Sequence, residues 1–144
     1  MAAAVVVSDQ LTKFAVRSCL EPAHSVPVIP PVLLLTYVQN TGAAFGLFRG
    51  YPGVFVLLSV AVMGWILLEF LRKERLTWST EMGLALILGG ALGNVIDRLR
   101  YGYVIDFIDV RVWPVFNAAD SAITIGVTLL ILDQFGFLHK KARS

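Results

Sequence analysis

The sequence has very few of the side chains that proteins use to bind metals or to form disulfides. It contains 1 cysteine, Cys19, and 2 histidines, His24 and His139. One cysteine cannot form an internal disulfide, and a zinc site built on thiolates is out of reach. Two histidines so far apart in the chain also make a poor candidate for a metal site. Any catalysis is therefore expected to depend mainly on carboxylates and hydroxyls.

Charge is also scarce. Charged residues make up 15% of the chain and the formal net charge is +2, a small and scattered excess that does not suggest nucleic-acid binding. Hydrophobic residues instead make up 57% of the 144 residues, and the mean hydropathy of +0.75 is far above that of an ordinary soluble domain. These values predict an integral membrane protein, and the length predicts a single domain over residues 1–144.

Four apolar runs resemble membrane helices, which need about 20 residues to span a bilayer. They cover residues 1–20, 54–71, 78–96 and 117–137. Asp9 interrupts the first run and no basic residue precedes it, which argues against a cleaved signal peptide. Only seven residues of this run precede Ser8, so we expect its helix to be short or truncated at its start. Gly89 and Gly93 share one face of the third run, as in closely packed membrane helices.

The region between the first two runs has a different character. Residues 21–52 hold five of the six prolines, so no continuous helix can form there and the region is expected to lie outside the membrane. Within it, residues 32–39 predict a short strand, and residues 101–113 are also expected to be extended. Asn40, Gly42 and Gly46 of the segment NTGAAFG permit tight turns and close approach of a ligand.

Four spans would place both termini on the same side of the membrane. The basic residues divide evenly between the two sides, six against six. One group is compact and flanks the ends of the apolar runs, which favours cytoplasmic termini; it consists of Arg72, Lys73, Arg75, Lys140, Lys141 and Arg143.

Two aspartates stand out as candidates for catalysis, because acids beside membrane-length segments are costly to keep. If residues 104–110 are extended, Asp106 lies on an apolar side, where a carboxyl group is hard to ionise. Asn117 is a favourable N-cap for the last run, and Asp120 occupies the third helical position, as in a capping box. The helix start favours the ionised form of Asp120. Two carboxyls in such different environments can divide acid and base roles, as in aspartic proteases.

Each acid also has a structural interpretation. Asp120 can be a plain capping residue, and Asp106 can form an ion pair with an arginine at the interface. Asp9 either pairs with Lys13 or orients the site. Structural pairs are expected for the other acids: Asp97 with Arg100, Asp109 with Arg111, Glu69 with Arg72 or Lys73, and Asp133 with Lys140 or Lys141.

Five segments together resemble a known family. DQLTK, NTGAAFG, GGALGNVIDR, GYVIDFID and FNAADSAI occur in this order among the four apolar runs, and the whole chain closely resembles the bacterial lipoprotein signal peptidases (signal peptidase II). The resemblance implies an all-α membrane protein with four transmembrane helices and a small extramembrane β-platform. It also implies an aspartic endopeptidase of the bacterial cytoplasmic (inner) membrane, which cleaves prolipoproteins before a diacylglyceryl-modified cysteine, with its active site toward the outer face.

The resemblance assigns roles to individual residues. By motif match, Asp106 and Asp120 form the catalytic pair, and Asp9 is a supporting acid. The implied substrate-binding residues are Asn40, Gly42, Asn94, Arg98 and Asn117. The implied partners are prolipoproteins carrying a diacylglyceryl cysteine, membrane lipids and globomycin-type inhibitors, with no nucleic acid. No metal or organic cofactor is required, because two carboxyls and one water suffice.

Two other classes of function compete with this one. A small proton-coupled transporter or channel subunit would use Asp9, Asp106 and Asp120 as a relay. It predicts acids near the middle of helices, whereas Asp106 and Asp120 lie near the expected membrane boundaries. A structural assembly protein would use the Gly89 and Gly93 face, but it leaves the acids unexplained.

Overall fold

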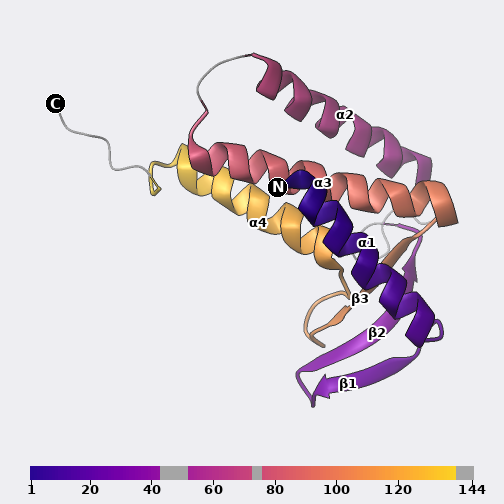
Figure 1. The fold of residues 1–144 in the computed structure, drawn as a ribbon. Coiled ribbons are helices and arrows are strands. Elements are labelled where there is room, and N and C mark those ends of the chain that lie inside the picture. Colours follow the sequence, from indigo (N-terminus) through magenta and orange to yellow (C-terminus); the bar gives the residue numbers. More distant parts are fainter. Residues whose placement is uncertain (43–51, 73–75, 139–144) are drawn as a thin grey trace.

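A computed structural model describes residues 1–42, 52–72 and 76–138, and these ranges contain four helices and three strands. The helices are α1 (Ala2–Cys19), α2 (Pro52–Leu71), α3 (Trp78–Tyr101) and α4 (Ala118–Gln134), and the strands are β1 (Ser25–Ile29), β2 (Leu33–Asn40) and β3 (Val104–Asp109). Figure 1 shows α3 at the centre of the bundle, between α2 on one side and α1 and α4 on the other. The sheet adjoins the end of the bundle where α1 and α3 finish.

Within the described ranges, two helices are long and apolar enough to cross a membrane, Gly53–Leu71 and Trp78–Tyr101. Only 6% of the most apolar part of α2 is buried, against 56% for α3, so α3 forms the core and α2 its outer cover. The helices expected at both ends of the chain are also present. Neither is counted among these two, because α1 contains three charged residues and α4 has only 17 residues.

Helix α3 begins and ends at residues with clear capping roles. The Thr77 hydroxyl accepts a hydrogen bond from the backbone N–H of Thr80, and Gly102 ends the helix in the left-handed conformation with φ of 78°. The apolar run predicted an end near residue 96, but the helix continues to Tyr101 because the charged Asp97 is fully buried against other elements rather than leaving the bundle. Glycine at the first non-helical position permits the positive φ.

Glycines let α3 approach its neighbours closely. A Cβ atom at Gly89 would lie 2.7 Å from the carbonyl oxygen of Ala2 in α1, and one at Gly93 would lie 2.5 Å from the Asp9 carboxylate. The predicted close-packing face is therefore confirmed, and its partner is α1. Gly90 serves α4 in the same way, because its Cβ would lie 2.5 Å from the carbonyl oxygen of Ala119.

The three strands form an antiparallel sheet in the order β1-β2-β3. Strands β2 and β3 confirm the extended segments predicted at residues 32–39 and within 101–113. The register pairs Val38 with Asp106, which brings Asn40 beside the candidate catalytic strand. Strand β1 was not predicted, because it contains Pro27; proline is tolerated here since β1 is an edge strand. The remaining glycine of the NTGAAFG segment, Gly46, lies outside the described residues.

Polar contacts hold the opposite end of the bundle. Asp133 in α4 accepts hydrogen bonds from hydroxyls at the start of α3, those of Thr77, Ser79 and Thr80. Its expected partners, Lys140 and Lys141, lie outside the described residues. The surface ion pair between Glu69 and Arg72 is confirmed at 3.0 Å.

Candidate active site

Asp106 and Asp120 line one cavity of about 320 Å³, although they come from a strand and a helix. Four of the predicted substrate-binding residues line the same cavity: Asn40, Gly42, Asn94 and Arg98. Residues 113–116, between β3 and α4, supply a largely apolar wall. The fold therefore gathers residues from β2, α3, β3 and α4 around the two carboxylates.

Asp106 is almost fully buried. Only 2% of the residue is exposed to solvent. One carboxylate oxygen accepts a hydrogen bond of 2.7 Å from the Asn117 amide, and the other accepts one of 2.9 Å from the Asn40 amide. Burial, together with the nearby negative charge of Asp120, raises the pKa of Asp106 to about 7 despite these hydrogen bonds. Near neutral pH this carboxyl can hold a proton.

Asp120 lies in the first turn of α4, where a capping box fixes its orientation. The Asn117 side-chain oxygen accepts a 2.9 Å hydrogen bond from the backbone N–H of Asp120, and the Asp120 carboxylate accepts one of 3.2 Å from the backbone N–H of Asn117. The predicted box is therefore confirmed. The Asn94 amide donates a further hydrogen bond of 2.8 Å to the Asp120 carboxylate. Hydrogen-bond donors therefore hold the Asp120 carboxylate from more than one side.

Asn117 contacts both candidate catalytic residues from a buried position behind the cavity. It is 0% exposed, and its side chain contacts both Asp106 and the start of α4. The same amide lies 3.1 Å from the side-chain oxygen of Asn94. In this geometry Asn117 positions the carboxylates and does not reach the cavity surface.

A buried ionic cluster supports the site from the side of α1. The Lys13 ammonium lies 2.8 Å from the carboxylates of both Asp9 and Asp97 and donates a 2.9 Å hydrogen bond to the Asn94 side chain. All three of its N–H donors are thereby used. Asp9 accepts a hydrogen bond of 3.0 Å from the backbone N–H of Ala119, next to Asp120. The cluster thus links α1 to the end of α4 that carries Asp120.

The same cluster reaches the strand that carries Asp106. The Asp97 carboxylate accepts a 3.1 Å hydrogen bond from the backbone N–H of Ile105 and one of 2.9 Å from the Gln10 amide. Because Ile105 precedes Asp106, Asp97 fixes the backbone at the first candidate catalytic residue. Both carboxylates are therefore positioned by groups outside the cavity.

Arg98 supplies the positive charge among the described residues that line the cavity. Its guanidinium lies 5.1 Å from the centre of the Phe55 ring in α2, an arrangement that holds the cation at the cavity. Within residues 1–42, 52–72 and 76–138, no group of three or more His, Cys, Asp or Glu is placed to hold a metal ion.

Comparison with known proteins identifies the family. A family model described as signal peptidase (SPase) II matches residues 1–136. The chain belongs to the signal peptidase II family. The lipoprotein signal peptidases of Moorella thermoacetica and Halothermothrix orenii are 49% and 46% identical to it over 130 and 128 residues; the matches cover 90% and 89% of this chain and 87% and 88% of theirs.

Solved structures agree with this assignment. Two bacterial membrane enzymes, determined by the in meso method at 2.3 and 1.9 Å resolution, match this signal peptidase II family member with TM-scores of 0.90 and 0.84. The sequence identities are 33% and 34%, and the matches cover 99% and 98% of this chain and 90% and 91% of the others. The chain is therefore a membrane protein and a protease, and the transporter hypothesis is not favoured.

Some of the ion pairs predicted for the acids of this signal peptidase II family member are wrong. Asp97 does not pair with Arg100, which is exposed; it pairs with Lys13, because the buried ammonium satisfies two carboxylates at once. Asp109 contacts Arg111 through the backbone N–H of that residue. Within the described part of the chain, Asp106 contacts asparagine amides and forms no ion pair with an arginine.

Sequence reasoning missed Gln10 and Asp97 as supporting residues and saw Lys13 only as a partner of Asp9. The expected pair of Asp9 with Lys13 is confirmed, and Asp9 also accepts a hydrogen bond from the backbone beside Asp120. A signal for Asp97 was present. It follows Gly93 by four residues and Asn94 by three, so it lies on the α3 face that the glycines turn toward α1.

Proposed function

We propose that this chain removes signal peptides from diacylglyceryl-modified prolipoproteins, as an aspartic endopeptidase that uses Asp106 and Asp120 and cleaves before the lipidated cysteine. The observation that carries the proposal is the shared cavity of two carboxyls in unlike environments. One is almost fully buried, with a pKa raised to about 7, and the other accepts hydrogen bonds at a helix start. Such a pair can supply an acid and a base at the same pH.

The reaction follows from these environments. Ionised Asp120 accepts a proton from a water molecule, whose oxygen attacks the scissile carbonyl carbon. Protonated Asp106 donates its proton to the carbonyl oxygen, which gives a neutral tetrahedral diol. The diol then collapses as the C–N bond breaks. One diol hydroxyl returns its proton to Asp106, and Asp120 gives its proton to the leaving amine of the cysteine.

The other cavity residues suit substrate binding. Asn40 and Arg98 present donors at the cavity. Gly42 lines the cavity beside Asn40, and its backbone N–H donates a 3.0 Å hydrogen bond to the Asn40 side-chain oxygen. We assign Asn94 as a positioning residue for Asp120, and Asn117 as a positioning residue for both carboxylates. Asp9 supports the start of α4. The donors can bind the peptide backbone or the developing oxyanion. Globomycin-type inhibitors are expected to occupy the same cavity.

The proposal includes a location. We place the protein in the bacterial cytoplasmic membrane with four spans, because α1 turns its charged Asp9 and Lys13 inward and α4 exposes apolar side chains such as Ile125 and Ile131. The compact basic group in the second loop and the C-terminal tail favours cytoplasmic termini. The cavity then faces the outer leaflet, where the acyl chains of the substrate stay in lipid while its peptide reaches the carboxyls.

A direct assay tests the function. Purified protein in detergent is incubated with a diacylglyceryl-modified prolipoprotein and, in parallel, with the same precursor lacking the lipid. The wild-type protein should release the signal peptide from the modified precursor, with a new N-terminal cysteine detected by mass spectrometry. Asp106→Asn and Asp120→Asn should each reduce kcat by about 10²–10⁴-fold, the usual contribution of a general acid or base.

Asp109→Asn is the matched control, because Asp109 lies on the same strand as Asp106 but does not line the cavity. It should cleave at close to the wild-type rate. Cleavage by both the Asp106 and Asp120 variants at the wild-type rate, with all proteins monodisperse on gel filtration, would show that the pair is not catalytic.

A further inference from the structure

The β1–β2 hairpin is unusually apolar for a segment outside the helical bundle. The stretch from Ser25 to Gly42 contains no charged residue. Around its turn, Val28, Ile29 and Val32 are 50%, 59% and 62% exposed. A contiguous group of exposed apolar side chains is uncommon on a surface that faces only water, and it marks an interaction site.

The sheet register brings a second apolar group to the same end. Ile29 pairs with Leu33 beside the turn, and the next residue of β2, Leu34, pairs with Asp109 at the end of β3. The chain that leaves β3 therefore starts at the turn end of the sheet. It carries Val112 and Trp113, which are 91% and 59% exposed. We call the five residues Val28, Ile29, Val32, Val112 and Trp113 the apolar tip.

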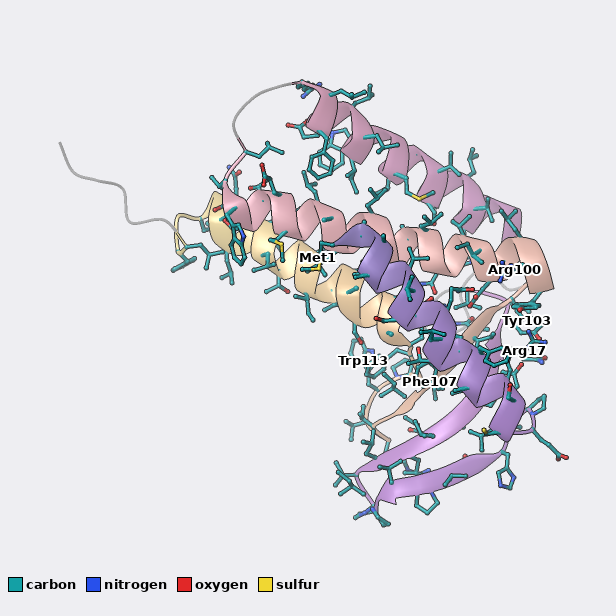
Figure 2. The ribbon with its side chains drawn as sticks, in the orientation of Figure 1. Met1, Arg17, Arg100, Tyr103, Phe107 and Trp113 are labelled. Atoms are coloured by element: carbon teal, nitrogen blue, oxygen red, sulfur yellow. The ribbon has the colours of Figure 1, made fainter. Side chains whose placement is uncertain are left out.

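The direction of the hairpin gives this tip a partner. Figure 1 shows the turn between β1 and β2 at the end of the hairpin away from the ends of α1 and α3, on the same side of the sheet as the start of α4. Figure 2 shows Trp113 on the side of the sheet away from Arg17 and Arg100, which lie where α1 and α3 end. Charged residues thus mark the end of the bundle that leaves the bilayer. The apolar tip lies on the opposite side of the sheet from these charged residues.

We propose that the apolar tip inserts into the outer leaflet of the bilayer beside α4, and that its occupant is lipid. Exposed apolar side chains partition into the acyl boundary, and tryptophan favours the membrane interface. Trp113 of the tip also lines one surface hollow together with Ile125 of α4, which is 54% exposed. The sheet is therefore a membrane-bound platform, and its insertion sets the depth at which the cavity meets a lipid-attached peptide.

The proposal rests on the membrane placement given above, but its test does not use peptidase activity. The only cysteine, Cys19, is replaced by Ser, and single cysteines are introduced as Val28→Cys and Val32→Cys. Each variant is labelled with an environment-sensitive fluorophore and placed in nanodiscs at one chain per disc. Leu57→Cys in α2, 70% exposed on a membrane helix, is the lipid-facing control. Glu21→Cys, before β1 and exposed, is the aqueous control.

Labels at positions 28 and 32 should emit at shorter wavelengths than the label at position 21. They should be quenched by lipids that carry a quencher on the acyl chain, as at position 57, and protected from iodide in solution. Quenching by iodide to the same extent as at position 21 overturns the proposal. A blue shift without quenching by lipid also overturns it, because the tip would then contact protein. Either result leaves the peptidase assignment untouched, since cleavage is measured separately.

Discussion

Asn117 and Asn94 contact each other directly, with the amide nitrogen of Asn117 lying 3.1 Å from the side-chain oxygen of Asn94. Each asparagine also donates to one candidate catalytic carboxylate, Asn117 to Asp106 and Asn94 to Asp120. The two acids are therefore joined through a buried amide pair. This arrangement keeps both carboxyls in place while leaving their cavity side open to water and substrate.

The rate of cleavage should fall as the pH rises through neutrality. The pKa of Asp106 is raised to about 7 by burial and by the charge of Asp120, and the proposed mechanism requires Asp106 to hold a proton. Above that pH the acid is lost, so kcat/KM should decline on the basic side with a midpoint near 7. A pH profile of initial rates in detergent measures this. A rate that keeps rising between pH 7 and pH 9 would contradict the assignment of Asp106 as the acid.

Asn40→Ala should shift the decline of kcat/KM on the basic side (the basic limb of the pH profile) to higher pH. The Asn40 amide stabilises the ionised form of Asp106, so its removal raises the pKa of Asp106 further and the proton is retained longer. Gln39→Ala is the matched control, because the Gln39 amide contacts the hydroxyls of Tyr37 and Tyr103. Its profile should match that of the wild type. A limb that stays fixed in Asn40→Ala would mean that Asp106 does not titrate on this side.

Lys13→Met should destabilise the fold strongly. It leaves Asp9 and Asp97 buried without their shared cation, and breaking a buried ion pair from one side costs about 3–5 kcal/mol. Glu69→Gln removes a surface pair with Arg72 and should cost about 0–1 kcal/mol. Reversible unfolding in detergent followed by circular dichroism compares the two. Equal losses would show that the Lys13 cluster is not a structural centre.

Gly90→Ala should separate α3 from α4. The new methyl group would lie 2.5 Å from the carbonyl oxygen of Ala119, and forcing atoms into such contact costs about 1–3 kcal/mol. Because Ala119 precedes Asp120, cleavage should slow as well. Gly64→Ala in α2 is the control, since its Cβ meets nothing within 4 Å. Thermal stability and kcat measured together test this, and wild-type values for Gly90→Ala would refute it.

The local signals in the sequence predicted much of the architecture. Apolar runs located the helices, and the Asn117 and Asp120 spacing predicted a capping box that the structure contains. The edge strand β1 escaped prediction because Pro27 is usually a sign against a strand. The end of α3 was predicted too early because the apolar run ends where the charged Asp97 begins. Asp97 is nevertheless buried, because it pairs with Lys13 on another helix.

The site was predictable only where a motif named its residues. The resemblance placed Asp106, Asp120 and four binding residues, and all six line one cavity. Which residues hold them could not be read from spacing, since Lys13 and Asn94 are 81 positions apart. Long-range packing decides such contacts. The same limit explains why Asn117 was expected to contact substrate although it is fully buried.

The capping box has an implication for how the protein changes over evolutionary time. The residues of the capping box at the start of α4 also orient the Asp120 carboxylate. A substitution that changes this orientation therefore also weakens the start of the helix. Selection for a different cargo must therefore act elsewhere, on the wall formed by residues 113–116, which contributes no carboxylate to the reaction. Diversity among homologues should concentrate there, while the asparagine and aspartate of the box stay invariant.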